Sequence, residues 1–382
     1  MDKVKNARIP QLVHDLVIEA HRCNFHCQYC LVAEAPSEFR TDRQELLPKQ
    51  ENPQLLAYEE GSALKRMLDP VLEHYRQVFD APILKISGGE AFLIAGLDAL
   101  VARSMNVYES VQILTNGSLF SESTLRRLAL LNGVHLQISL DGHRYEMNQL
   151  RVASPQHHAC LLRNLDEAVH AGLPVEIFCV VHRYNAAALA EFADFLLQRF
   201  DGAVGLTPFP VRGAVGMRFV PDAGQDIGLV RLMEEFDRYG QILPAKAYLL
   251  AMHEIVFKRQ PRQLGCVIPR IMLQSFHDGR VTPCPYSWLE EIGSLANDPD
   301  RLAAIFGKTA GYRVRGMNPP RASFCRSCVT DSYPLSLFFA HQITLHELCH
   351  NRPILGRPRA KARLLDLQQR FDTARESSRD CA

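Results

Sequence analysis

The sequence lacks a strong charge of either sign. Its 43 Lys and Arg residues nearly balance its 42 Asp and Glu residues, which leaves a formal net charge of +1. A chain so balanced offers no general electrostatic attraction for nucleic acid or for an anionic membrane. We therefore expect neither of them as a partner.

The sequence also lacks a long apolar run. It contains no stretch of about eighteen uncharged apolar residues, and its start, MDKVKNARIP, has no apolar core of the kind that a secretory signal needs. These absences predict a cytoplasmic protein without a membrane span. A reducing compartment argues against a disulfide framework, so the spacing of the eleven cysteines should report metal binding or redox chemistry.

The chain has 382 residues, which is more than one small domain needs. Hydrophobic residues make up 47% of it and charged residues 22%, as is typical of a globular protein without long disordered segments. Apolar runs that predict strands alternate with amphipathic stretches that predict helices. The strands are expected at 12–18, 81–87, 110–116, 134–140, 174–181 and 203–209, and the helices at 59–79, 97–107, 121–131, 157–171 and 186–199. This alternation predicts an α/β fold, a partial (β/α)6 barrel of the TIM type, with a doubly wound sheet as the competing architecture.

The alternation stops after residue 212. Helices are expected at 226–239 and 245–258, and the segment IMLQSFHDGRVTPC predicts a hairpin that turns at Asp278 and Gly279. A small cysteine-containing domain and a helical tail follow, the tail with eight Lys or Arg against four Asp or Glu. We divide the chain into a barrel at 1–215, a helical linker at 216–263, the small domain at 264–350 and the basic tail at 351–382.

Three cysteines follow the first predicted strand on one short segment. Cys23, Cys27 and Cys30 lie in CNFHCQYC. Three thiolates on one loop can hold three irons of a cubane 4Fe-4S cluster, which leaves the fourth iron open to a small molecule. A zinc site with His21 or His26 as fourth ligand is the alternative.

Three further motifs stand at the ends of predicted strands. SGGE (87–90), TNG (115–117) and SLDG (139–142) follow the second, third and fourth strands, and Arg151 stands twelve residues after the serine of SLDG. Paired glycines let the backbone approach a ligand closely, a carboxylate can accept from an ammonium, and a guanidinium can bind a carboxylate through two hydrogen bonds. Because the carboxyl ends of parallel strands meet at one end of a barrel, we expect these motifs to lie together.

The spacing C-x3-C-x2-C, with an aromatic residue before the last cysteine, is similar to the signature of the radical SAM superfamily. The GGE and TNG segments also resemble motifs of this family, and SLDG…R resembles a pattern of its peptide-modifying branch. The resemblance implies a 4Fe-4S cluster with an open iron that reduces S-adenosylmethionine to a 5'-deoxyadenosyl radical, which abstracts hydrogen from a substrate. The residues that it implies for cofactor binding are Tyr29, Gly88, Gly89, Glu90, Asn116, Ser139 and Arg151.

Four cysteines of the small domain form a second pattern. Cys266, Gly279 and Cys284 give C-x12-G-x4-C, and Cys325 and Cys328 give C-x2-C. The pattern resembles the first half of a SPASM domain, but Pro334 stands where a further cysteine is expected. This implies the shorter twitch form with one auxiliary 4Fe-4S cluster on these four cysteines. A four-cysteine zinc site is the alternative.

The resemblance implies an enzyme whose substrate is a ribosomally made peptide that receives a crosslink, a thioether or an oxidation. Expected partners are that peptide, a separate leader-binding protein, because only about twenty residues precede Cys23, and a flavodoxin- or ferredoxin-type electron donor. Sulfatase maturation is disfavoured, since Pro285 and not Asp follows Cys284. The alternatives are a small-molecule oxidoreductase of aminocyclitol or cofactor biosynthesis and a non-catalytic zinc-binding protein. The sequence assigns no catalytic residue.

Overall fold

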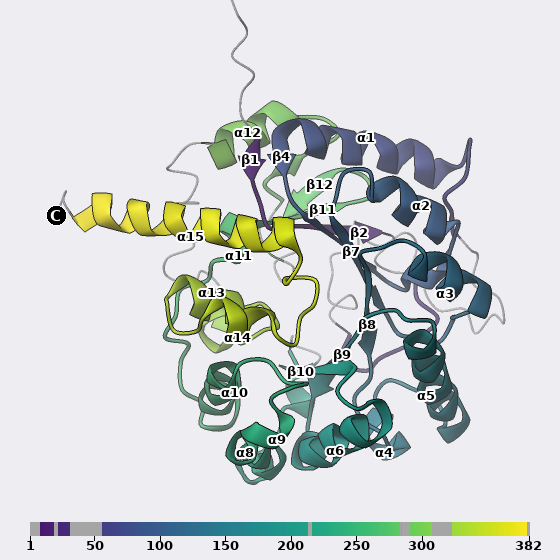
Figure 1. The fold of residues 1–382 in the computed structure, drawn as a ribbon, viewed down its shortest axis with the longest axis vertical. Helices are drawn as coiled ribbons and strands as arrows, with labels where there is room; N and C mark the ends of the chain where they lie inside the picture. Colours follow the sequence, from purple (N-terminus) through teal and green to yellow (C-terminus); the bar gives the residue numbers. More distant parts are fainter. Residues whose placement is uncertain are drawn as a thin grey trace, which may run out of the picture.

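The computed structural model describes residues 8–18, 22–30, 56–212, 216–282, 284, 291–307 and 323–379. In this part of the chain, a nine-stranded sheet forms the centre of the molecule (Figure 1). Its first six strands in the chain are parallel to one another and confirm the six predicted strands. They are β2 (Val13–Ile18), β5 (Ile83–Gly88), β7 (Ser110–Thr115), β8 (Val134–Ser139), β9 (Val175–Val181) and β10 (Val204–Pro210).

The order of these strands decides between the two predicted architectures. Each parallel strand lies beside the one that precedes it in the chain, from β2 through β5, β7, β8 and β9 to β10. A doubly wound sheet would reverse its order at a switch point. The sheet curves as one arc with helices on its outer side (Figure 1), so the partial barrel is confirmed and the doubly wound alternative is wrong.

The helices between the strands pack their apolar sides on the outer face of the sheet. α5 shows why they start where they do, because the Ser154 side chain accepts from the backbone N–H of His157 and Pro155 occupies the first turn. The helices are α1 (Ala63–Val78), α2 (Leu97–Ser104), α3 (Glu122–Ala129), α4 (Tyr145–Asn148), α5 (Pro155–His170) and α6 (Leu189–Phe200). Short parallel strand pairs lie outside the main sheet: β1 (Ile9–Pro10) with β4 (Phe79–Asp80), and β3 (Leu56–Ala57) with β6 (Ile94–Ala95).

A network of polar side chains around Glu176 lies on the inner face of the barrel. The buried Glu176 carboxylate of β9 accepts from Gln112 Nε2 of β7 at 3.3 Å and from Gln137 Nε2 of β8 at 3.1 Å, and it also accepts from the Thr207 hydroxyl of β10. Since β7 and β10 are not neighbours, these side chains can meet only on the concave face. The strands are therefore apolar towards the helices, and this polar network occupies the interior at the level of Glu176. Nearer the cysteines, Val180 and Phe209 make the interior apolar.

The predicted hairpin is confirmed, and it joins the barrel sheet. β11 (Met272–Phe276) pairs antiparallel with β12 (Arg280–Thr282) and parallel with β2, while β13 (Gly293–Ser294) pairs with β12. Gly279 supplies the positive φ of 92° that the turn requires. The sheet thus runs without interruption from the barrel into the cysteine-containing part of the chain, whereas the predicted domain limits stay predictions.

The remaining helices close the side of the molecule between β10 and β11 (Figure 1). α10 (Lys246–Met252) contacts α13 (Tyr333–Phe339), which contacts α14 (Leu345–Cys349). The other helices here are α8 (Ile227–Glu234), α9 (Phe236–Tyr239), α11 (Ile268–Ile271) and α15 (Pro358–Arg379). α12 (Pro299–Gly307) lies elsewhere and contacts α1 and β13.

The basic C-terminal segment lies against the amino-terminal ends of the barrel strands. Arg363 of α15 donates to the carbonyl of Gln11 at 2.9 Å and pairs with the Asp80 carboxylate at 2.6 Å, and the N–H of Arg359 donates to Glu109. Arg352 faces Glu176 at 3.6 Å. These basic side chains cover the amino-terminal end of the barrel, opposite the cysteines, which we call the floor of the barrel.

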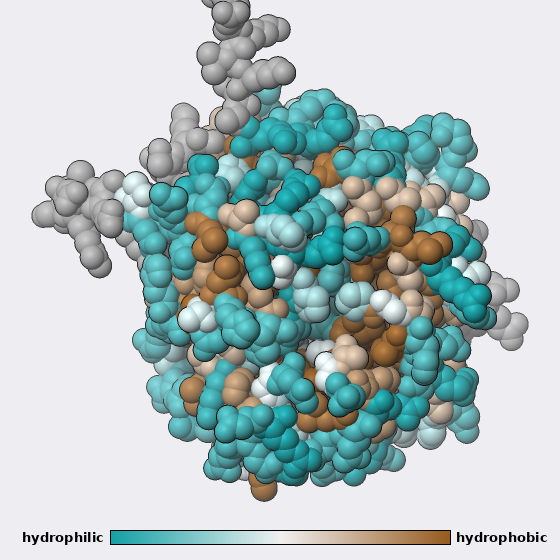
Figure 2. Space-filling view, viewed as in Figure 1, coloured by the Kyte–Doolittle hydropathy of each residue, from teal (hydrophilic) through white to brown (hydrophobic). Residues whose placement is uncertain are grey.

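The face of the molecule drawn in Figure 2 is mostly hydrophilic. On the face drawn in Figure 2, hydrophilic side chains form the rim and hydrophobic ones gather in patches towards its middle. None of the helices in the described ranges combines the length and the apolar character that a membrane span requires.

The contacts of Arg363 make its contribution to stability testable. Replacing Arg363 with Ala leaves the Asp80 carboxylate and two carbonyls without this donor, so we expect a loss of about 1–3 kcal/mol in the free energy of unfolding, measured by urea denaturation. The control is Arg370→Ala on the same helix, an exposed residue that pairs only with Asp366 within the described interactions and should cost at most ~0.5 kcal/mol. Equal losses in the two variants would contradict the role of Arg363.

Candidate functional site

The cysteine loop, residues 22–30, leaves the carboxyl end of β2. Its three cysteines are partly buried. Cys23 Sγ accepts from the N–H of Phe25 at 3.4 Å and from Asn116 Nδ2 at 3.8 Å, and Cys27 Sγ accepts from Arg151 Nη1 at 3.9 Å. Burial raises the pKa of the Cys23 and Cys27 thiols to about 12, so the thiolates need a positive partner. The loop thus holds its sulfurs among donors that favour the thiolate form.

Gly88 and Gly89 hold the end of β5 against the cysteine loop. A Cβ on Gly88 would lie 2.0 Å from the Ile18 carbonyl oxygen, and one on Gly89 would lie 1.9 Å from that of Arg22. The N–H of Glu90 donates to the same Arg22 carbonyl at 2.8 Å. The glycines are therefore required for close packing of two backbone segments, which the sequence did not predict. Their contact with a cofactor stays a prediction.

The Glu90 carboxylate joins this loop to the TNG motif. Its Oε1 accepts from the Thr115 hydroxyl and its Oε2 from the N–H of Asn116, both at 2.6 Å. Burial raises the pKa of Glu90, although these donors oppose the rise. Asn116 in turn donates through Nδ2 to Asn24 of the cysteine loop at 2.8 Å. The ends of β5 and β7 are thus tied to the loop that carries Cys23.

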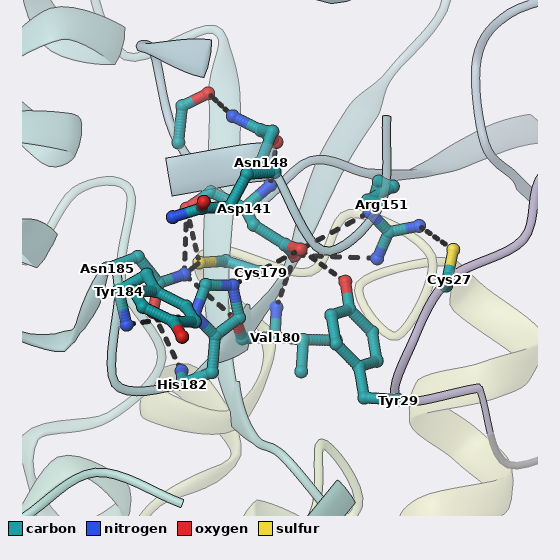
Figure 3. Close-up of polar contacts among 12 residues, drawn as sticks. Cys27, Tyr29, Asp141, Asn148, Arg151, Cys179, Val180, His182, Tyr184 and Asn185 are labelled. Carbon is teal, nitrogen blue, oxygen red and sulfur yellow. Dashed lines mark hydrogen bonds and ion pairs between the residues drawn. The ribbon is translucent and has the colours of Figure 1, made fainter. Parts of the chain in front are cut away.

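The SLDG motif brings a buried carboxylate to the other side of the cysteine loop (Figure 3). Asp141 lies 3.4 Å from two nitrogens of Arg151, accepts from the N–H of Val180 at 3.0 Å, and accepts from the Tyr29 hydroxyl. His182 Nε2 lies 3.7 Å from the same carboxylate. Burial alone would raise the pKa of Asp141, but the Arg151 guanidinium and the other donors hold it below its ordinary value.

The structure brings most of the predicted cofactor residues together. Tyr29 is buried and packs in a small cluster with Phe209 of β10, and burial raises the pKa of its hydroxyl well above the ordinary value. Ser139 is the partly exposed last residue of β8. The sequence assigned Asp141 no role, although its place inside the motif was a signal. It also missed His182, a lone buried histidine that no pattern distinguished.

The second cysteine group is placed in part. Burial raises the pKa of Cys266. Arg262 links its segment to that of Cys328, because it donates to the Gly265 carbonyl at 3.1 Å and to the Cys328 carbonyl at 2.9 Å. The N–H of Cys328 donates to the Cys325 carbonyl at 3.2 Å. Cys284 lies just beyond the end of β12, and its direct neighbours in the chain lie outside the described residues. Cys349 is buried, and its thiol donates to the Leu355 carbonyl at 3.4 Å.

The donor set around the first three cysteines fits an iron–sulfur cluster. Within the described ranges, no three His, Cys, Asp or Glu side chains converge closely enough to hold one metal ion. A cubane does not require such convergence, because each thiolate binds a different iron. Of the two histidines considered as a fourth zinc ligand, His26 is exposed and His21 lies outside the described residues. Donors aimed at two of the sulfurs suit an anionic cluster.

Comparisons with known proteins agree with this geometry. Residues 17–196 match the family model described as the Radical SAM superfamily. The chain is 27% identical over 183 residues to a GTP 3',8-cyclase of Helicobacter pylori, covering 47% of this chain and 50% of the relative. It is 29% identical over 189 residues to the mycofactocin maturase MftC of Mycobacterium tuberculosis, covering 49% and 42%. The chain thus spans about half the length of the curated relatives it matches.

Solved structures of the Streptococcus suis protein SuiB share the fold. The structure bound to S-adenosylmethionine gives a TM-score of 0.54 at 14% identity, covering 84% of this chain and 72% of SuiB. The structure bound to the precursor peptide SuiA gives 0.56 at 15% identity, covering 86% and 70%.

The barrel is a radical SAM domain, with its cysteine loop at the carboxyl end of the first parallel strand. The match to the Radical SAM superfamily applies to this domain, at residues 17–196.

The close approach at Gly89 gives a direct test of the site. Gly89→Ala must push the Arg22 carbonyl away, so we expect the variant to stay folded while binding at most half the iron of the wild-type protein after anaerobic reconstitution. Iron content and thermal unfolding measure the two effects. Gly224→Ala is the control, because a Cβ there meets no atom within 4 Å. Full iron binding by Gly89→Ala would show that the approach does not position the cysteines.

Proposed function

We propose that this enzyme cleaves S-adenosylmethionine reductively and uses the resulting radical to modify a ribosomally made peptide. The observation that carries the proposal is the meeting of Cys23, Cys27, Glu90, Asn116 and Arg151 at one end of the barrel, through contacts of 2.6–3.9 Å. These residues come from the ends of different strands, as is usual for active sites in barrels of this kind.

Cys23, Cys27 and Cys30 would hold a 4Fe-4S cluster with one open iron, and S-adenosylmethionine would bind at that iron. When bound, the cluster supplies the electron that breaks the carbon–sulfur bond. The chain's own residues bind and orient the cofactor. We assign contacts with its amino group to Gly88, Gly89 and Glu90, and contacts with its ribose and carboxylate to Ser139 and Arg151.

Tyr29 and Asn116 complete the proposed cofactor site. Tyr29 covers the inner side of the cysteine loop together with apolar side chains such as Leu150 and Phe209, which exclude water from that side. Asn116 orients the loop through its contacts with Asn24 and Cys23. A dry, ordered surround suits a site that must keep a reactive radical away from solvent.

The charges inside the barrel favour a peptide substrate over a nucleoside triphosphate. Lys85 faces Asp331 at 3.8 Å and Arg352 faces Glu176 at 3.6 Å. These basic side chains are therefore already balanced by carboxylates, whereas phosphate groups are bound by basic side chains with charge to spare. Gln137 Oε1, on the same inner face, is a buried acceptor without a hydrogen-bond partner among the described residues, and it matches the N–H of a peptide. The likeness to SuiB, solved with a precursor peptide, supports the same choice.

We further propose that Cys266, Cys284, Cys325 and Cys328 hold one auxiliary 4Fe-4S cluster in a twitch-like module at 264–350. Two polar bridges link this module to the barrel interior. Thr282, two residues before Cys284, donates to Gln274, which donates to Asp15 of β2 at 3.2 Å. Asp331, three residues after Cys328, faces Lys85 of β5. These bridges support a position of the proposed module beside the interior where a substrate would react.

Partners and location follow from the proposed reaction. The peptide substrate would bind with a separate leader-binding protein, a flavodoxin- or ferredoxin-type donor would reduce the first cluster, and the reducing chemistry suits the cytoplasm. The barrel at 1–215, the linker at 216–263 and the tail at 351–382 are the other proposed parts of the chain.

The first cluster is tested by replacing its ligands. Anaerobically reconstituted protein should hold roughly eight irons, from two four-iron clusters. Replacing Cys23, Cys27 and Cys30 together with Ala should abolish formation of 5'-deoxyadenosine from S-adenosylmethionine under reduction and keep about half the iron. Cys160→Ala, a partly buried cysteine outside both groups, is the control. Cleavage by the triple variant would refute the proposed cluster.

The auxiliary cluster is tested in the same way. Replacing Cys325 and Cys328 with Ala should remove the other half of the iron, while cleavage of S-adenosylmethionine continues because the first cluster is intact. Metal analysis decides between this cluster and the zinc alternative. Zinc in place of iron and sulfide in the wild-type protein would refute the auxiliary cluster.

A further inference from the structure

Asp141 is the meeting point of three segments of the site (Figure 3). Its carboxylate contacts Tyr29 from the cysteine loop, Arg151 from the loop after α4, and the N–H of Val180 from β9. It is fully buried, and a buried carboxylate is stable only when such partners surround it.

The backbone of Asp141 is held as firmly as its side chain. Its N–H donates to Asn148 Oδ1 at 2.8 Å, and its carbonyl accepts from Asn185 Nδ2 at 2.9 Å. Asn148 also donates to the Gly142 carbonyl at 2.7 Å. The carboxylate is therefore fixed from both sides and can serve as a rigid anchor.

Arg151 uses two sides of its guanidinium at once. Nε and Nη2 each lie 3.4 Å from an oxygen of Asp141, while Nη1 lies 3.9 Å from Cys27 Sγ. The planar guanidinium can hold a carboxylate along one edge and still direct donors elsewhere. Its positive charge thus stands beside the cysteine loop and is compensated by Asp141.

We propose that Asp141 is a positioning residue that fixes Arg151 and Tyr29 against the cysteine loop and cancels the charge of Arg151 beside Cys27. The proposal rests on the proposed function, since it concerns the cluster that Cys27 would ligate. Cluster potentials depend on nearby charge and hydrogen bonds, and a charge acts strongly in a buried site. With Asp141 in place, the pair beside Cys27 is neutral, and the cluster keeps a lower potential than a lone arginine would impose.

Single and double variants test the sign of this effect. Asp141→Asn keeps the shape and removes the negative charge, so the uncompensated Arg151 should raise the midpoint potential of the first cluster. Arg151→Gln should lower it, and the double variant should return it close to the wild-type value. Asp141→Glu keeps the negative charge, so its midpoint potential should lie between those of Asp141→Asn and the wild-type protein. Tyr29→Phe is the matched control, because it removes one hydrogen bond from Asp141 and keeps both charges.

The measurement is an EPR-monitored redox titration of reconstituted full-length protein without S-adenosylmethionine, on the signal that changes when this compound is added afterwards. Opposite shifts in the two single variants support the proposal. Folded, iron-loaded variants with unchanged potentials overturn it. If Asp141→Asn does not fold, the proposal is decided by whether Arg151→Gln lowers the midpoint potential. Should the signal persist when Cys23, Cys27 and Cys30 are all replaced, the proposed cluster itself is wrong, which is a separate result.

Discussion

The contact between the backbone after β5 and the backbone of the cysteine loop is the constraint on which the site depends. Two successive glycines, Gly88 and Gly89, lie where a Cβ would collide with the carbonyls of Ile18 and Arg22. The close contact lets the N–H of Glu90 bond to the Arg22 carbonyl, and it lets the Glu90 carboxylate reach the TNG motif. The cysteine loop has no regular secondary structure of its own, so its shape comes from these neighbours.

Polar side chains inside the barrel stabilise the sheet that carries the site. Asp15, Lys85, Gln112, Gln137 and Glu176 stand on five successive strands of the sheet, β2, β5, β7, β8 and β9. Buried polar groups are stable only in networks, and Glu176 provides one by accepting from neighbours on three strands. The strands are therefore held by helices on one face and by a hydrogen-bonded network on the other.

Much of this was predictable from the sequence. The apolar runs give the six parallel strands, because a strand covered by helices must be apolar towards them. The motifs at the ends of those runs give the neighbourhood of Cys23 and Cys27. The doubly wound alternative could not be dismissed, since strand order is set by pairing between segments far apart in the chain. The parallel pairing of β11 with β2 was missed for the same reason. The contacts of Asp141 were also not predictable, because the SLDG motif contains the acid but does not show which side chains bind it.

The course of the C-terminal segment has a consequence for how the molecule is made. Arg363 bonds to the carbonyl of Gln11, so the first and last parts of the described chain meet at the floor of the barrel. During synthesis the amino-terminal part emerges first, and contacts between distant segments form slowly. The sheet can therefore assemble first as an arc that is open at this end, and the contacts of Arg363 are added only after α15 has been translated.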